Sequence, residues 1–384
     1  MILDRFKKFG LRVPLIRSIV SGFLAKRGVL IRTSKLNEFL DEALVVKLKE
    51  KLDFGIEVRV GLVKDGEHNF DGFVHRRHDY PKYERFLKNN SIAYDFFDPK
   101  LSTWIKDVNN FDIIVWRVES DLHKQNVSKR QIYFLERVMG KIVYPSFHEV
   151  WFYEEKINTH FLFNQLGLPE IPTFYSSSYI ECLEYIKNCD YPIVSKINTG
   201  SASYGVDVLK SRRSAKAFVN SVFSLTGRKT YWPFQRQKDY VFFQEFISDA
   251  KFDLRVIVIG NFLFGYYRYP KAGDFRASGS GIVEKKEIPH DVLELAYHVK
   301  EAYEAVSLAT DFLFSTSEQK YYIIESSIFI GVDSCEQLMV NGVSGVYERT
   351  GENCYEFRKG RYWIQELALQ QFFLKIQNSQ TVSE

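Results

Sequence analysis

The most constraining feature of this chain is a series of strand-like segments that end beside charged residues. The apolar segment Pro192–Lys196 ends in a lysine, and a loop of small residues, Thr199–Gly205, follows it. Farther along, strands are predicted at Tyr240–Phe246, Asp253–Ile259, Asn261–Tyr269, Thr310–Phe314 and Lys320–Glu325. Lysines and a glycine-containing loop suit phosphate groups, while carboxylates on neighbouring strands suit Mg²⁺. The pattern predicts an ATP site. Because the sequence has neither GxxxxGK[ST] nor GxGxxG, that site is built without a P-loop.

The composition is that of a folded protein. The chain is 45% hydrophobic and 26% charged, and its 384 residues are enough for two or three domains. Its four cysteines form no CxxC pair, which is typical of reduced cytosolic thiols. No apolar run reaches the roughly 18 residues that a membrane span needs. We therefore expect a cytoplasmic protein.

Residues 1–36 form a separate basic arm. They contain nine Lys or Arg and a single Asp, a net charge of +8. Their apolar residues are spaced for one face of a helix, so the arm could lie on an anionic membrane surface. The alternative is a helix packed on its own protein or on a second subunit, as in a homodimer.

Three further regions follow the arm. Residues 37–147 alternate strand and helix signals and predict a small α/β domain. Residues 148–240 begin with a helix predicted from about Glu149 to Leu166, which Gly167 and Pro169 end. This middle region closes with an irregular segment, 224–239. Residues 241–384 hold the dense strands and a closing helix, so the overall class is α/β with a strand-rich final domain.

Two short segments suit a nucleotide. The small residues of the loop after Lys196 allow successive backbone N–H groups to point at phosphates without a Cβ clash. The strand end Gln244–Ile247 can offer its extended backbone to an adenine edge while Phe246 or Ile247 packs on the ring. Asp253, a few residues on, can accept hydrogen bonds from ribose hydroxyls.

Basic side chains cluster after this segment. Arg255 and Arg268 lie on predicted strands, and Lys271 and Arg276 lie in a loop rich in Gly and Ser. Charge clusters are usually solvated faces, but guanidinium groups pair bidentately with phosphate or carboxylate oxygens. We therefore predict that Arg276 binds the transferring phosphoryl group. A substrate carboxylate is expected near these arginines and Arg117.

Two acids complete the pattern. Asp311 and Glu325 belong to strands that a hairpin would pair, which would bring both carboxylates to one place. Oxygen ligands with phosphates completing the shell are the usual Mg²⁺ arrangement.

In these residues the chain resembles the ATP-grasp superfamily, in the branch of glutathione synthetase and the ribosomal-protein glutamate ligases, over roughly Tyr144–Ser327. The resemblance implies three α/β domains with the nucleotide between two antiparallel sheets. It implies that Lys156 and Lys196 bind phosphates and that Gly200, Ser201, Ser203, Tyr204 and Gly205 belong to a flexible phosphate loop. Glu245 and Ile247, within the segment Gln244–Ile247, correspond to the adenine-binding hinge, and Asp253 corresponds to the ribose-binding acid. Arg276 corresponds to the arginine that contacts an acyl phosphate.

Asp311 and Glu325 correspond to the family's magnesium acids. The sequence departs from the family at Ser327, where an Asn usually provides the third metal ligand. A serine hydroxyl is a shorter and weaker ligand, so the number of metals is open at this point.

The resemblance implies an ATP-dependent carboxylate–amine ligase that forms an amide through an acyl phosphate. The expected partners are a small-molecule or glycan-linked carboxylate and an amine. A sugar acid or amino acid in bacterial surface-polysaccharide synthesis is one such substrate. The alternatives are a kinase acting on a hydroxyl and a catalytically degenerate nucleotide-binding scaffold. The net charge of +4 is mild and no basic motif interleaved with aromatics stands out, so no nucleic-acid partner is expected.

Overall fold

The computed structural model describes residues 14–49, 58–66, 72–200, 205–230 and 235–381. Its α-helices are α2 (Pro14–Lys26), α3 (Leu36–Leu40), α4 (Tyr80–Asn89), α5 (Trp104–Asp107), α6 (Leu122–Tyr133), α7 (Phe147–Phe152), α8 (Lys156–Leu166), α9 (Tyr179–Asn188), α10 (Arg212–Val222), α11 (His290–Ala302) and α12 (Ile364–Thr381). The strands of the first two-thirds are β1 (Leu30–Arg32), β2 (Arg59–Val63), β3 (Phe73–His75), β4 (Ala93–Phe97), β5 (Ile113–Val115), β6 (Ile142–Tyr144), β7 (Thr173–Ser176), β8 (Ile193–Lys196), β9 (Val206–Leu209), β10 (Arg228–Lys229), β11 (Arg236–Gln237) and β12 (Val241–Glu245). The later strands are β13 (Asp253–Ile259), β14 (Phe262–Arg268), β15 (Val283–Glu284), β16 (Ser307–Ser315), β17 (Lys320–Ser327), β18 (Met339–Val340), β19 (Val343–Gly351) and β20 (Cys354–Lys359).

The first sheet is parallel and has the order β4-β2-β5-β6. Val60, Leu62 and Ile114 are fully buried, as expected for parallel strands covered on both faces. Because β2 precedes β4 and β5 in sequence but lies between them, the strand order reverses there. The carboxyl ends of β2 and β5 therefore flank a topological switch point, where open parallel sheets bind ligands.

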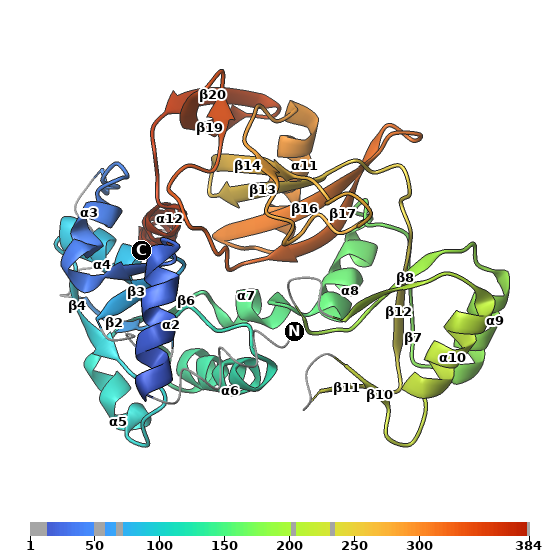
Figure 1. Ribbon diagram of the computed structural model, residues 1–384. Helices are drawn as coiled ribbons and strands as arrows, with labels where there is room; N and C mark the ends of the chain where they lie inside the picture. The colour runs from blue at the N-terminus through green and yellow to red at the C-terminus, as the bar shows by residue number, and fades with distance from the viewer. Residues whose placement is uncertain (1–13, 50–57, 67–71, 201–204, 231–234, 382–384) are drawn as a thin grey trace.

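The second sheet is antiparallel, with the order β7-β12-β8-β9. Helices α9 and α10 lie together on one face of it, at the right of Figure 1. Their apolar sides bury Ile186 and Val219 against Ile193 and Phe243.

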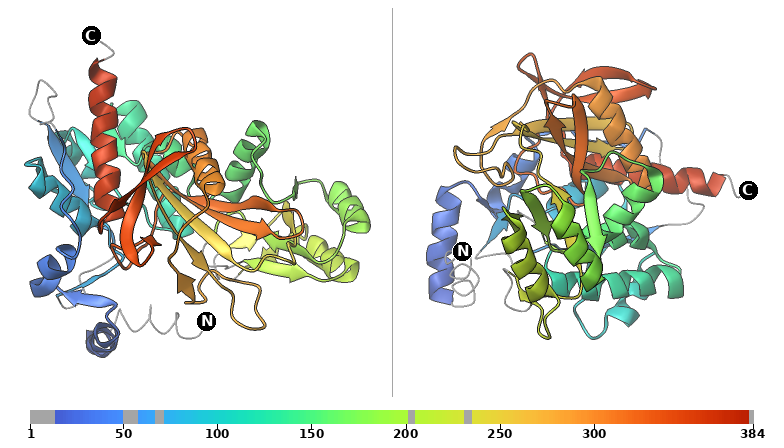
Figure 2. Two further views of the ribbon diagram at one scale, coloured as in Figure 1. Left: turned by 90° about the horizontal axis from the view of Figure 1, so that it is seen from above. Right: turned by 90° about the vertical axis from the view of Figure 1, so that its right-hand side faces the viewer.

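The third sheet is the largest, with the order β17-β16-β13-β14-β19-β18 and with β15 and β20 paired to β14 and β19. Helix α11 packs on β13 and β16. Helix α12 joins this sheet to the N-terminal region, because Phe373 stacks on Phe86 of α4 with ring centroids 6.1 Å apart. The Trp363 indole N–H, just before α12, also donates to the Leu40 carbonyl at 2.9 Å. Figure 2 shows α12 passing between these parts.

The second and third sheets are tied together by backbone hydrogen bonds beside β17. The Ile323 amide donates to the Pro169 carbonyl at 2.8 Å, and the Ile171 amide donates to the Ile323 carbonyl at 3.2 Å. The two antiparallel sheets therefore lie at a defined distance from each other at this end. The predicted mixed α/β class with two antiparallel sheets is confirmed.

The prediction of a single helix from about Glu149 to Leu166 is wrong in one respect, because the structure has two helices there, α7 and α8. The break lies at Glu154, whose φ of 55° places it in the left-handed region. Helix α7 begins with a capping box between Ser146 and Glu149, and α8 ends at Gly167 in the left-handed conformation, as predicted. Among the described residues, no helix is long and apolar enough to cross a membrane.

Candidate active site

A cavity of about 350 Å³ lies between the second and third sheets. Its volume is within the range of small-molecule and cofactor sites. Eleven of the residues singled out from the sequence line it: Lys156, Lys196, Gly200, Gln244, Glu245, Phe246, Ile247, Asp253, Arg276, Asp311 and Glu325. The structure thus brings most of the predicted site together from α8, two sheets and a loop.

Two lysines supply positive charge at one end of the cavity. Lys156 begins α8, and its Nζ donates to the Gly200 carbonyl at 2.6 Å and lies 4.0 Å from Glu325 Oε2. Lys196 ends β8, and its buried Nζ lies 3.5 Å from the Ile324 carbonyl. Burial lowers the pKa of Lys196 to about 8, with Glu325 opposing the shift and Lys156 adding to it. Two ammonium groups beside one carboxylate leave a site that favours anions.

The loop after β8 is shaped by its last glycine. Gly205 has a φ of 76°, and a Cβ there would meet the Ile197 side chain at 2.4 Å. Only glycine fits this conformation and this close approach. Ser201, Ser203 and Tyr204 lie outside the described residues, so their expected roles remain predictions.

The predicted hinge follows β12. Gln244 is buried, and its amide donates to the Thr173 hydroxyl at 3.0 Å. The Glu245 amide donates to the Pro172 carbonyl at 3.0 Å, after which the chain leaves the sheet. Phe246 and Ile247 line the cavity from this exit.

Four charged residues form a network at the cavity wall, which Asp253 and Asp311 line. Arg255 is opposite Asp311 on β13 and β16, and Arg268 is opposite Asp253 on β14 and β13. Arg255 binds Asp311 bidentately at 2.6 and 2.7 Å, while Arg268 reaches Asp311 at 2.7 Å and also binds Asp253. Arg255 and Arg268, two of the four arginines predicted near the substrate carboxylate, are therefore engaged by carboxylates of the protein itself.

The network shifts the pKa values of its two acids, Asp311 and Asp253, in opposite directions. Burial would raise the pKa of Asp311, but Arg255 and Arg268 outweigh it and lower that pKa to about 2. Burial and the charge of Asp311 raise the pKa of Asp253 to about 7. Asp311 is thus the stronger acid of the two.

The loop between β14 and β15 holds the other two basic residues. Arg276 lines the cavity, and its guanidinium binds Asp274 with contacts of 2.9 and 3.0 Å. Lys271 is exposed and is not among the residues that line the cavity.

The two predicted metal acids face each other. Asp311 and Glu325 are register partners on β16 and β17, as the expected hairpin requires. In the described part of the chain Glu325 has one ion pair, with Lys156 at 4.0 Å, and its side chain is 40% exposed, while both Asp311 oxygens already accept from arginine. The pair fits one Mg²⁺ completed by phosphate oxygens, with Glu325 as the freer ligand. No group of three or more His, Cys, Asp or Glu in the described part of the chain is arranged for a metal ion.

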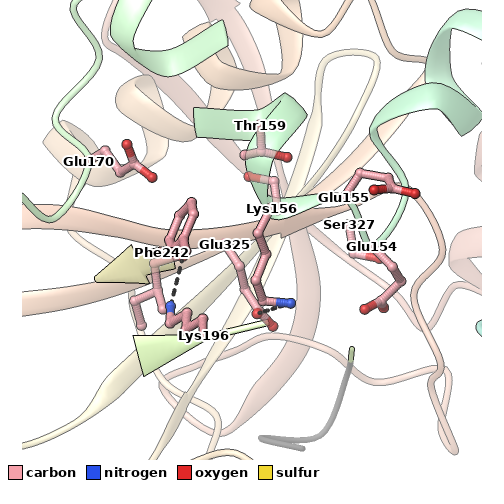
Figure 3. Close-up of a pocket in the computed structure, with 11 residues that line it drawn as sticks. Glu154, Glu155, Lys156, Thr159, Glu170, Lys196, Phe242, Glu325 and Ser327 are labelled. Atoms are coloured by element: carbon pink, nitrogen blue, oxygen red, sulfur yellow. Dashed lines mark hydrogen bonds and ion pairs between the residues drawn. The ribbon is translucent and has the colours of Figure 1, made fainter. Parts of the chain in front are cut away.

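Ser327 lies on the same strand, two residues beyond Glu325. Its hydroxyl donates to the Phe329 carbonyl at 3.0 Å and lines a small adjoining cavity with Glu154 and Glu155 (Figure 3). The hydroxyl is therefore engaged as a donor, and no described residue donates a hydrogen bond to its oxygen.

Glu154 is a residue of this region that the sequence analysis missed. It lies at the break between α7 and α8, and burial raises its pKa to about 7 while Lys156 opposes the shift. The apolar spacing of residues 149–166 hid the break. The consecutive acids Glu154 and Glu155 before Lys156 were the available signal.

Comparisons with known proteins agree with this architecture. No protein-family model matches the chain. Over 217 residues it is 28% identical to the alpha-aminoadipate–LysW ligase LysX of Saccharolobus solfataricus, covering 54% of this chain and 74% of that protein. The structure is similar to D-cycloserine synthetase DcsG, with a TM-score of 0.54 and 14% identity over 82% of this chain and 99% of that one. It is also similar to D-alanine–D-alanine ligase from Bacillus anthracis complexed with ATP, with a TM-score of 0.52 and 11% identity over 84% and 99% of the two chains.

The chain shares its fold with these two solved structures, and the resemblance seen in its sequence is confirmed at the level of the fold.

Proposed function

We propose that the protein is an ATP-dependent carboxylate–amine ligase that forms an amide through an acyl phosphate. The observation that carries the proposal is the cavity between the two antiparallel sheets. It has two lysines and a glycine loop at one end and the facing acids Asp311 and Glu325 nearby. Support also comes from the relative and the two structural neighbours above, whose names describe ligases or synthetases.

The residues suggest a division of labour. Lys156, Lys196 and the loop ending at Gly205 would hold the ATP phosphates, and residues 244–247 would hold the adenine. Asp311 and Glu325 would hold Mg²⁺, which supplies charge neutralisation at the phosphates when bound. A substrate carboxylate oxygen attacks the γ-phosphorus and ADP leaves. Arg276 is placed to neutralise charge on the transferred group.

Hydroxylamine trapping tests this function. The protein is incubated with ATP, Mg²⁺, hydroxylamine and a panel of carboxylic acids, and formation of a hydroxamate with release of ADP is the expected result. Lys196→Met should reduce the rate by about 10- to 100-fold, since a charge-assisted contact to phosphate is lost. Lys187→Met, a change of an exposed lysine on α9, is the matched control. ADP binding without hydroxamate from any acid would contradict the ligase.

One observation favours a second candidate. Because Ser327 stands where the family usually has Asn and its hydroxyl is bonded to Phe329, a nucleotide-binding scaffold is the competing function. It predicts nucleotide binding with no turnover in the presence of any acid. A phosphorylated alcohol without amide would instead identify a kinase.

A finer proposal concerns the carboxylate. The Glu-x-Ser ending at Glu325 resembles enzymes of bacterial surface-polysaccharide synthesis, so we propose a sugar acid, an amino acid or a glycan-linked carboxylate. Uronic acids and amino acids in the hydroxamate panel test it directly. Exclusive use of unrelated acids would contradict it.

The arm offers a membrane contact. In α2 the side chains of Leu15, Ile19 and Phe23 are 77%, 70% and 52% exposed and recur every four residues, beside Lys26 and Arg27. The right-hand view of Figure 2 shows α2, in dark blue, at the edge of the molecule. We propose that this face lies on an anionic membrane surface. Residues 1–13 of the arm lie outside the described residues.

Vesicle sedimentation separates the two uses of this face. Binding to vesicles with anionic lipid, weakened by salt and by Ile19→Glu, supports the membrane. A dimer in light scattering that Ile19→Glu dissociates, without vesicle binding, would assign the face to a second copy instead.

A further inference from the structure

The switch point of the parallel sheet carries a second set of charged residues. Asp65 follows β2 and Arg117 follows β5, so the two strand ends place them side by side. Ligands of open parallel sheets bind at this position, outside the carboxyl ends of the strands. The first sheet therefore has a candidate site of its own, which the nucleotide cavity does not include.

Arg117 is positioned there with one edge engaged and the other free. Its Nε lies 3.4 Å from Asp79 Oδ2 and 3.9 Å from Asp65 Oδ2. Asp65 is itself held by the backbone N–H groups of Asp79 and Tyr80, at 2.9 to 3.0 Å. The two terminal nitrogens of Arg117 donate no hydrogen bond to any residue that the structure describes. Since the side chain is only 22% exposed, this leaves a largely desolvated guanidinium fork that suits a carboxylate.

Glu154 lies between two residues that are each held by contacts of their own. The Tyr153 ring before it is buried against Phe329, with centroids 4.8 Å apart. The Glu155 carboxylate after it binds Lys129 at 2.7 Å and also contacts Asn198. A non-glycine residue in the left-handed region costs about 1 kcal/mol or more and persists only where its surroundings determine it. The contacts of Tyr153 and Glu155 therefore hold the Glu154 backbone in this conformation.

Phe329 connects the two charged groups. Its ring packs on Tyr153, and the Arg117 guanidinium carbon lies 5.8 Å from the ring centroid. The pKa of the Glu154 carboxyl is affected by the charges of Lys156, Glu325, Arg255 and Arg117. Its carboxylate makes no hydrogen bond or ion pair with the described residues, and Figure 3 shows it pointing to a different side of the backbone from Glu155. A carboxylate without a partner among the described residues thus lines the small cavity beside Lys156 and Glu325, and the charge of Arg117 acts on it.

We propose that Arg117 and Glu154 bind the amine substrate and that this substrate is an amino acid. Its carboxylate would pair with the free edge of Arg117, and its ammonium group would pair with Glu154, on the side of Lys156 and Glu325. This inference rests on the proposed ligase function. An amine without a carboxylate would leave the terminal nitrogens of this largely desolvated guanidinium without an acceptor, so the site would discriminate against it.

The placement agrees with the chemistry of amide formation. The nitrogen of the amino acid forms a C–N bond to the acyl carbon as the C–O bond to phosphate breaks, and phosphate keeps the electron pair of that bond. Of the three ammonium protons, one stays on the amide, one leaves on HPO₄²⁻ and one goes to solvent. Glu154 is thus a positioning residue that delivers the nitrogen to the acyl phosphate.

Calorimetric binding tests the site without turnover. The probes are the common L-amino acids and D-alanine, each with its α-carboxamide, titrated into the full chain with ADP and Mg²⁺. We expect at least one amino acid to bind about 10- to 100-fold more tightly than its carboxamide. Arg117→Leu should abolish this difference, and Glu154→Gln should weaken the amino acid and spare its N-acetyl derivative. Arg130→Leu and Glu184→Gln, which change exposed residues of α6 and α9, are matched controls.

Several results would overturn the proposal. They are the absence of binding by every amino acid, equal binding of acid and carboxamide, or an unchanged preference in Arg117→Leu. Thermal melts of each variant, with Arg117→Lys as a conservative rescue, separate loss of the site from loss of the fold. Hydroxamate trapping keeps the two proposals distinguishable. A wild-type protein that makes hydroxamate but shows no amino-acid preference sinks this inference alone, whereas one that makes no hydroxamate sinks the ligase.

Discussion

Asp311 and Glu325 are register partners on β16 and β17, yet arginines hold the Asp311 carboxylate whereas the Glu325 carboxylate is more exposed. The Asp311 side chain is 4% exposed with both oxygens bound by arginine, whereas the Glu325 side chain is 40% exposed and lies 4.0 Å from Lys156. The two facing carboxylates therefore differ in role. Asp311 neutralises buried positive charge, and Glu325 is the more accessible of the two to a cation.

This difference predicts opposite results for two conservative changes. Glu325→Gln should weaken binding of Mn²⁺, used as a magnetic probe for Mg²⁺, and leave the unfolding free energy nearly unchanged. Asp311→Asn should destabilise the fold by about 3 to 5 kcal/mol, because it leaves Arg255 and Arg268 buried without a full counter-charge. Electron paramagnetic resonance and urea unfolding measure the two effects. Equal loss of stability in both variants would contradict the assignment.

The phosphate loop offers a steric test with an internal control. Gly205→Ala and Gly140→Ala both place alanine at a positive φ, 76° and 66° respectively. Each should cost about 1 kcal/mol for the backbone conformation. Only Gly205→Ala adds a clash, with Ile197 at 2.4 Å, whereas nothing lies within 4 Å of the new Cβ at Gly140. We expect Gly205→Ala alone to lower the affinity for ADP, as measured by calorimetry. An equal affinity in the two variants would show that the loop shape is not needed for binding.

Arg276 and Lys271 share a loop but differ in what they face. Arg276 lines the cavity and Lys271 does not. Arg276→Ala should therefore reduce hydroxamate formation by about 100-fold, in the range of a lost transition-state donor, with little change in melting temperature. Lys271→Ala should have a much smaller effect. The reverse order of the two effects would move the transfer role from Arg276 to Lys271.

Lys82 lies outside the site, and its burial leads us to expect that the free energy of unfolding depends on pH. Its buried Nζ donates to the carbonyls of Arg76 and His78 at 2.7 and 2.6 Å. Burial lowers its pKa from 10.5 to about 8, against the opposing effect of Asp79 and Asp65. Between these two values the unfolded chain holds a proton that the folded chain has lost, so stability rises with pH in this window.

The measurement compares the wild type with Lys82→Met in urea between pH 7 and 10. The unfolding free energy of the wild type should rise relative to that of the variant by up to about 1.4 kcal/mol per pH unit above pH 8. Parallel pH profiles for the two proteins would mean that Lys82 keeps an ordinary pKa in the fold.

Strands of the second and third sheets were predictable because their apolar runs are long and their turns are polar. Tyr240–Phe246 and Asp253–Ile259 correspond to β12 and β13 within a residue or two, and the facing of Asp311 and Glu325 followed from the expected hairpin. Such features depend on neighbouring sequence alone. Local pattern was enough to find them.

Features set by distant contacts were not predictable. The break at Glu154 interrupts a good helical pattern, because Phe329 captures Tyr153 while Lys129 and Asn198 hold Glu155. The pairing of Arg255 and Arg268 with Asp311 depends on cross-strand register, which the sequence does not display. Both arginines therefore looked free in the sequence and are paired in the structure.

The hydrogen bonds that Ile323 makes with Pro169 and Ile171 also limit how the protein can move. They fasten the chain between α8 and β7 to the strand that carries Glu325, two residues away. At the far side of the cavity, Phe246 and the exposed Phe275 meet only through an edge-on ring contact, with centroids 5.7 Å apart. We therefore expect the second sheet, β7-β12-β8-β9, to rotate as a unit about an axis near Ile323. ATP would then arrive past Phe275, while the cation-binding strand keeps its place throughout the cycle.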